Sequence, residues 1–287
     1  MMLCSVKTAA VSAAIALAMA GPASAYSLTN GELSVNQLTN GAIDAFTFGE
    51  DFYNPGTSLS DWGLMDETGF ASATTEGGVG TGLAFGTQTG VDSTSATAVG
   101  TFNGAWSFTR TFVLDPVEPL LTVILEVTRT AAGSGSITMF ETADPDQGGS
   151  SSTTNDVLTQ GGLTVAQAIG DNGRTAAFAT GGSLVGFGGY SFGLGITSES
   201  ELVGFLSSPF DPDGDYDDVG FAAALTATLA QGESATLTTW WSAGENAADA
   251  LAALPDIEAS PVPVPAAAPL LAGALGALAL LRRRRRG

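Results

Sequence analysis

The sequence predicts an all-β protein, an antiparallel β-sandwich with one short C-terminal helix, set between two terminal segments of different composition. Segments of alternating apolar and polar residues recur along its middle, and 38 glycines supply turns between them. Strand patterns do not alternate regularly with helix patterns, which favours antiparallel sheets over a parallel one. The body, residues 26–258, fits a single sandwich of the large supersandwich or jelly-roll type, because no linker-like composition divides it.

The clearest strand covers residues 105–114, where Trp106, Phe108 and Phe112 share one face with Arg110. Residues 120–129 alternate in the same way, and a third strand is predicted at 137–142. Further strands are predicted at 32–38, 43–48, 94–103, 174–180, 184–196, 201–206, 219–229 and 233–242. A helix is predicted at 245–254 and a helical turn at 164–169, whereas residues 71–82 and 147–161 are predicted to be long loops.

Composition excludes several classes of function. The chain contains 29 Asp and Glu, 9 Lys and Arg, no His and one Cys. Without histidine it has no imidazole base, no Ser-His-Asp triad and no His-ligated metal. Only Arg110, Arg129 and Arg174 lie between Glu32 and Glu258 with all 29 acidic residues, so this stretch carries a net charge of −26. Such a body does not suit the phosphate backbone of nucleic acid.

The N-terminus has the three parts of a secretory signal peptide, predicted over residues 1–25. Lys7 supplies the positive charge, residues 9–20 form a short apolar stretch, and Ala23 and Ala25 form the small-x-small site that signal peptidase requires. Cleavage is expected before Tyr26, although an uncleaved anchor is the alternative. Cys4 leaves with the signal peptide, so the mature protein would lack disulfides.

The C-terminus, residues 259–287, contains a Pro-rich linker, sixteen apolar residues from Ala266 to Leu281, and the arginines 282–286. As a helix the apolar stretch would span roughly 24 Å, slightly less than a hydrocarbon core of about 30 Å. Terminal arginines favour the cytoplasmic side of a membrane. A short transmembrane helix in the inner membrane is therefore predicted.

This tail resembles the VPLPA-type member of the PEP-CTERM sorting signals. The resemblance rests on the motif Val262, Pro263, Val264, Pro265 and Ala266, the following helix, and Arg282, Arg283, Arg284, Arg285 and Arg286; Val264 stands where the family usually has Leu. It implies an exosortase-type transpeptidase as a partner, a transient inner-membrane intermediate, and then release to the cell surface or an exopolysaccharide matrix. The alternative is a permanent C-terminal anchor.

Residues 105–146 also resemble the large β-sandwiches of carbohydrate-handling proteins, which have successive long strands of this kind. Galactose-mutarotase-like enzymes of that architecture rely on histidine. Since this chain has none, the resemblance does not imply their activity.

The strongest candidate for a metal site lies around Gly214. Five carboxylates, Asp211, Asp213, Asp215, Asp217 and Asp218, fall within eight residues. Oxygen ligands on a flexible loop suit Ca²⁺, although the spacing is not that of an EF-hand. The alternative is a solvated acidic loop.

A second acidic segment contains Glu141, Asp144 and Asp146, with Asp156 ten residues further on. Asp144 and Asp146 are weaker candidate ligands, because an Asp-Pro-Asp sequence also suits an Asx-capped turn. The two acidic segments could meet in space and complete one site.

Two further features bear on function. Arg110 on an apolar face is expected either to extend its charged group to the surface along its apolar stem or to pair with Glu or Asp, rather than to serve a substrate. Trp240 and Trp241 should point to opposite faces of a strand, one into the core and the other available to pack or to stack on sugar.

The sequence favours a non-enzymatic exported structural protein of the surface or matrix. The alternative is a calcium-dependent carbohydrate-binding module, and a lesser one is a glycoside hydrolase that uses two carboxylates. No catalytic residue and no cofactor other than Ca²⁺ is predicted.

Overall fold

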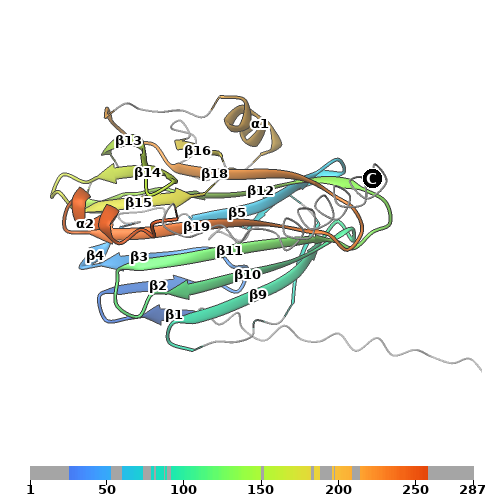
Figure 1. The fold of residues 1–287 in the computed structure, drawn as a ribbon, viewed down its shortest axis with the longest axis horizontal. Coiled ribbons are helices and arrows are strands. Elements are labelled where there is room, and N and C mark those ends of the chain that lie inside the picture. Colours follow the sequence, from blue (N-terminus) through green and yellow to red (C-terminus); the bar gives the residue numbers. More distant parts are fainter. Residues whose placement is uncertain are drawn as a thin grey trace, which may run out of the picture.

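The computed structural model of the chain describes residues 26–52, 60–73, 79–80, 82–86, 88, 92–149, 152–181, 184–187, 196, 198–208 and 214–257. Within them, two antiparallel sheets pack face to face and two short helices lie on their outer sides (Figure 1). This confirms the predicted antiparallel sandwich. The signal peptide, the Pro motif, the apolar tail and the arginine cluster lie outside the described residues. None of the described helices is long and apolar enough to cross a membrane.

The ten-stranded sheet, here sheet A, is built mainly around β12 and β18. Its main path runs β1 (Tyr26–Thr29), β2 (Leu33–Gln37), β3 (Ile43–Phe48), β5 (Ser60–Asp66), β12 (Gly135–Ala143), β18 (Phe221–Leu229) and β16 (Leu184–Phe187). Off this path, β4 (Glu50–Asp51) pairs with β3, β6 (Gly69–Ala73) with β5, and β7 (Val79–Gly80) with β6.

The nine-stranded sheet, here sheet B, contains the two longest strands that the structure describes. Its order is β17 (Tyr216–Asp217), β13 (Thr153–Gln160), β14 (Leu163–Ile169), β15 (Thr175–Thr180), β19 (Ser234–Gly244), β11 (Leu120–Arg129), β10 (Trp106–Leu114), β9 (Ser95–Phe102) and β8 (Leu83–Phe85). A short 3-10 turn, η1 (Gln147–Gly149), lies between β12 and β13.

The main core lies between the two sheets and follows the alternation read from the sequence. On β10, Trp106, Phe108 and Phe112 face inward with Arg110. The inward-facing apolar residues of β11 are Leu121, Val123, Leu125 and Val127. Trp241 of β19 lies in this core, whereas Trp240 points to the outer side and is half-buried against the cluster under α2 (Ala247–Ala252). The predicted opposite orientation of the two tryptophans is confirmed.

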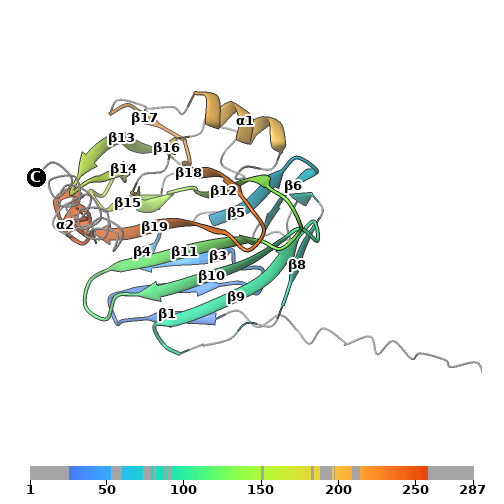
Figure 2. The ribbon, with the colours of Figure 1, turned by 45° about the vertical axis from the view of Figure 1, so that its right-hand side comes forward.

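Each helix covers apolar residues on the outer side of one sheet (Figure 2). Under α1 (Glu199–Ser207), Phe140, Ala222 and Ala224 of sheet A contact Leu202 and Phe205. Under α2 lie apolar residues of β14 and β15 in sheet B. Most outward residues of β9, β10, β11 and β19 in sheet B are polar.

The predicted strand at 201–206 is wrong, because this segment belongs to helix α1. The hydroxyl of Ser198 accepts a hydrogen bond from the backbone N–H of Glu201, which caps the helix, and Glu199 and Glu201 lie in its first turn. Leu202 and Phe205, three residues apart, form the buried side. The apolar run therefore follows a helical rather than a strand period.

Several other segments differ from prediction. The helical turn expected at 164–169 is strand β14, whose alanines are buried. The loop predicted at 147–161 contains η1 and strand β13, and the loop at 71–82 contains the end of β6 and strand β7. The predicted helix at 245–254 is the shorter α2. Strand β16 covers the start of the predicted strand at 184–196, and residues 188–195 lie outside the described residues.

Gly63 is required by close packing within sheet A. A Cβ atom there would clash with the Ala71 carbonyl oxygen and the Phe140 ring. Gly63→Ala is expected to lower the free energy of unfolding by about 1–3 kcal/mol through overpacking. The control is Gly204→Ala in α1, where a Cβ meets nothing within 4 Å. This substitution should raise the free energy of unfolding by about 0.5–1 kcal/mol, because alanine favours a helix over glycine. Urea unfolding of both variants checks this, and equal effects would contradict it.

Candidate metal site

The two acidic segments predicted from the sequence meet at one end of the sandwich. Asp144, Asp146 and Asp218 each present one carboxylate oxygen, and these oxygens lie within 4.8 Å of one another. Asp144 and Asp146 are buried and Asp218 is half-buried. Three carboxylates from segments more than 70 residues apart in the chain therefore form one cluster, the carboxylate triad.

The register of sheet A brings these segments together. Ala143, the last residue of β12, pairs with Phe221, the first residue of β18. Asp144 leaves β12 at that pair, and Asp218 precedes β18 at the same end. Pairing of Asp217 in β17 with Thr153 in β13 holds the second segment against sheet B.

The backbone around the triad is fixed by hydrogen bonds. The backbone N–H of Asp146 donates to the Phe52 carbonyl oxygen at 2.7 Å. Buried Asn155 accepts at its carbonyl oxygen from the N–H of Gly214 and donates its own N–H to the Asp215 carbonyl oxygen. Gly214 has φ +83°, a conformation that favours glycine, and this explains the glycine among the aspartates.

Asp144 and Asp146 are buried with few groups to stabilise their negative charge. Asp144 is 3% exposed and Asp146 4% exposed. Within the described part of the chain, one oxygen of each has no hydrogen-bond partner. Burial, with the negative charges of Asp146 and Asp218, raises the pKa of Asp144 to about 8. Burial and Asp218 raise the pKa of Asp146 to about 7. Unpaired buried carboxylates are costly unless a proton or a cation neutralises them.

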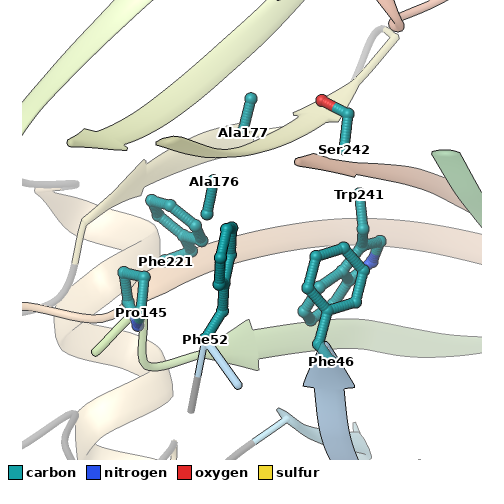
Figure 3. Close-up of a pocket in the computed structure, with 8 residues that line it drawn as sticks. All are labelled: Phe46, Phe52, Pro145, Ala176, Ala177, Phe221, Trp241 and Ser242. Atoms are coloured by element: carbon teal, nitrogen blue, oxygen red, sulfur yellow. The ribbon is translucent and has the colours of Figure 1, made fainter. Parts of the chain in front are cut away.

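A small apolar cavity of the core adjoins the Asp-Pro-Asp segment of the triad. Pro145, between the two buried aspartates, lines it together with Phe52, Phe221, Trp241 and Phe46 (Figure 3). The cavity has room for about one water molecule. The Asp-Pro-Asp sequence thus presents proline to the aromatic core while its flanking carboxylates join Asp218.

The remaining predicted ligands are placed differently. Asp215 is exposed, and Asp217 pairs with β13 through its backbone. Asp211 and Asp213 lie outside the described residues. Among the predicted candidates in the described segments, the structure joins Asp144, Asp146 and Asp218. The sequence ranked Asp144 and Asp146 as the weaker pair, yet they are the most buried members.

Tyr216 is an exposed aromatic residue two positions before Asp218. It is 53% exposed, and its hydroxyl donates to an Asp171 carboxylate oxygen at 3.3 Å. The sequence analysis did not single it out, although an aromatic residue amid five aspartates was the available signal. A solvent-accessible ring therefore lies two residues before Asp218 in the chain.

Glu141 does not belong to the acidic cluster. It faces inward from β12 and pairs with Arg110 of β10 at 3.3 Å, with both side chains fully buried. The Thr239 hydroxyl donates to Glu141, Trp241 Nε1 donates to that hydroxyl, and the Gly41 carbonyl oxygen accepts from Arg110. The expected acidic partner of Arg110 is thus identified as Glu141, inside the sandwich.

Comparisons with known proteins establish the fold alone. No protein-family model matches the chain, and no curated protein matches it significantly. The structure is similar to a bacterial glucoamylase complexed with acarbose, with a TM-score of 0.54 and 12% identity over 81% of this chain. The match spans only 35% of the glucoamylase chain.

Two other solved structures are similar to this chain with lower TM-scores. A putative aldose 1-epimerase from Escherichia coli K12 has a TM-score of 0.37 and 13% identity, covering 77% of this chain and 99% of that one. A galactose mutarotase-like protein from Lactobacillus casei ATCC 334 has a TM-score of 0.42 and 7% identity, covering 77% and 100%. The glucoamylase similarity supports the large sandwich expected from residues 105–146.

Proposed function

We propose that this chain is an exported, non-enzymatic sandwich protein of the cell surface or extracellular matrix that binds Ca²⁺ at Asp144, Asp146 and Asp218. The observation that carries the metal assignment is the carboxylate triad itself: three oxygens within 4.8 Å, from two buried side chains and one half-buried one. The unpartnered buried oxygens of Asp144 and Asp146 support it independently.

The geometry and ligand type favour calcium. Two oxygens bound to one Ca²⁺ lie at most about 5 Å apart, because each Ca–O distance is roughly 2.3–2.6 Å. The triad is all oxygen, which suits a hard cation. Calcium takes six to eight oxygens, so backbone carbonyls, water or a ligand would complete the coordination. The proposed ion also removes the repulsion within the triad.

Calorimetric titration of the purified protein with CaCl₂ tests the site. Binding is expected for the native protein, with proton release, because Asp144 and Asp146 hold protons near neutral pH. Asp144→Asn and Asp218→Asn should weaken binding at least about tenfold, the loss expected for a charged ligand. Asp44→Asn, at an exposed position of β3, is the matched control. Equal affinity in all four proteins would refute the assignment.

Export and sorting form the second part of the proposal. The signal peptide over residues 1–25 and the tail over 259–287 support delivery through signal peptidase and an exosortase-type transpeptidase. Mass spectrometry of the protein released from cells should find Tyr26 as the first residue and no arginines 282–286. Released protein that keeps Arg282–Arg286 would contradict exosortase cleavage.

One observation favours a calcium-dependent carbohydrate-binding module as a second candidate function. Exposed Tyr216, two residues before Asp218, would offer an aromatic ring to a sugar whose hydroxyl oxygens complete the coordination of the cation. Glycan-array binding that requires Ca²⁺ and is lost in Tyr216→Ala would support it. Turnover of a glycoside by the native protein but not by Asp144→Asn would instead support the carboxylate hydrolase.

A further inference from the structure

The part of the outer face of sheet B over β9, β10, β11 and β19 is unusually rich in hydroxyl groups. Of the nineteen outward positions of these four strands, Leu120, Ser242 and Gly244 are buried near α2; eleven of the other sixteen are Ser or Thr, and none of those sixteen is buried. We call this surface the hydroxyl face. Its hydroxyl residues are Ser95, Thr97, Thr101, Ser107, Thr109, Thr111, Thr122, Thr128, Ser234, Thr236 and Thr238.

The strand register arranges these residues in rows across four strands. One row contains Thr101, Ser107, Thr128 and Ser234, each directly opposite the next. Another contains Thr97, Thr111, Ile124 and Thr238 in the same way. Neighbouring strands are about 4.8 Å apart, and alternate residues along a strand are about 6.8 Å apart. The hydroxyls thus form a repeating two-dimensional array.

Charge is nearly absent from this array. Its one charged member is Glu126, although 29 acidic residues lie between Glu32 and Glu258 with only three arginines. The other non-hydroxyl members are Val99, Val113, Ile124 and Trp240. A face whose only role is to remain hydrated would be expected to share the charge of the body, as surfaces that keep proteins soluble do.

The boundary of the hydroxyl face carries an aromatic ring. Trp240 lies on the outer side of β19, opposite Thr122 of β11 and Ala179 of β15. It is half-buried because it packs against the apolar cluster under α2. The same sheet surface is therefore apolar where α2 covers it and hydroxyl-rich where no described helix does, with a tryptophan between the two regions.

From this arrangement we propose that the hydroxyl face binds an uncharged polysaccharide laid across β9, β10, β11 and β19. Threonine presents a hydroxyl and a methyl group together, and a pyranose ring likewise presents O–H and C–H groups. Neutrality matches this partner to a nearly uncharged face, whereas the acidic body would repel polyanions. Trp240 would stack on a sugar at the α2 end of the strand array. The inference rests on the proposed matrix role, because the matrix is where the protein would meet such a polysaccharide. It does not rest on the metal site.

Depletion assays with microcrystalline cellulose, curdlan and chitin test the inference, with alginate beads as the polyanionic comparison. The native protein should bind at least one of the three neutral polymers and not alginate. Thr109→Lys/Thr111→Lys should weaken binding at least about tenfold, because lysine side chains would block several hydrogen-bonded contacts. Thr109→Val/Thr111→Val, which keeps the shape but removes both hydroxyls, should weaken it by a smaller factor.

Thr228→Lys is the matched control, because Thr228 is an exposed strand residue on sheet A. It should bind as the native protein does, and thermal melting should show all variants folded. Binding should also survive EDTA and Asp144→Asn. Absence of binding to all three neutral polymers would overturn the inference.

Two other outcomes would overturn the inference while leaving other conclusions intact. Binding lost with EDTA or Asp144→Asn but kept in the lysine variant would move the sugar to the carboxylate triad. A concentration-dependent dimer in sedimentation that the lysine variant abolishes, without polysaccharide binding by the native protein, would assign the hydroxyl face to a second copy of this chain.

Discussion

Replacing Glu141 with leucine while Arg110 is kept is expected to lower the free energy of unfolding by about 3–5 kcal/mol, because a buried guanidinium would lose its charged partner. Arg110 is fully buried, and its guanidinium carbon lies 5.2 Å from the centroid of Trp62 and 4.7 Å from that of Phe112. These rings attract the cation but do not neutralise it. Denaturant unfolding measures the loss.

Two matched variants separate charge burial from packing. Arg110→Met/Glu141→Leu removes both charges and should recover most of the stability, since a buried ion pair often contributes little net stability over apolar residues. Arg174→Met breaks the exposed pairs with Glu50 and Glu245, and should cost no more than about 1 kcal/mol. A loss in Glu141→Leu no greater than in Arg174→Met would contradict the assigned role of the buried pair.

The metal-free protein is expected to lose stability as the pH rises from about 5 to 8. Asp144 and Asp146 have folded-state pKa values of about 8 and 7, above the ordinary value of 3.8. At pH values between the ordinary pKa and the folded-state pKa, the folded chain holds protons that the unfolded chain releases. The free energy of unfolding therefore falls as the pH increases. The difference should be at least about 2 kcal/mol, since each pKa unit corresponds to about 1.4 kcal/mol.

Urea unfolding in EDTA at pH 5 and pH 8 measures this slope. Millimolar Ca²⁺ should flatten or reverse it, because the metal binds the deprotonated triad. Asp144→Asn/Asp146→Asn should abolish the slope, whereas Asp44→Asn should retain it. Equal stability of the metal-free protein at the two pH values would show that the two carboxylates are not titrating in this range.

Strands with clear alternation could be predicted from the sequence, because one buried face fixes the period. Strand β11 has the predicted bounds, and pairing with an acidic residue was one of the two alternatives predicted for Arg110. Strand β14 was missed because its Ala-Gln-Ala segment is buried at successive positions and shows no period of two. Helix α1 was missed because an apolar run this short fits a strand as well as a helix, and the Ser198 cap is the feature that favours the helix.

The composition of the site could be predicted, but its membership could not. Aspartate-rich segments indicated a hard cation, and the meeting of the two segments was considered. Which carboxylates meet depends on the pairing of Ala143 with Phe221, a contact between strands far apart in the chain. Glu141 and Asp144 are three residues apart, yet one faces Arg110 across the sandwich and the other joins the triad.

The position of the triad has a consequence for the unfolded chain. Asp144 and Asp218 are 74 positions apart, so an ion held by both would act as a reversible cross-link around a long loop. A covalent cross-link closing a loop of this length would reduce the conformational entropy of the unfolded state by an amount equivalent to roughly 4 kcal/mol. A coordinated ion gives up this link when the chain unfolds, so its contribution instead depends on the free calcium concentration. In a chain whose one cysteine is Cys4, the concentration of an external ion would set how firmly the two acidic segments are tied together.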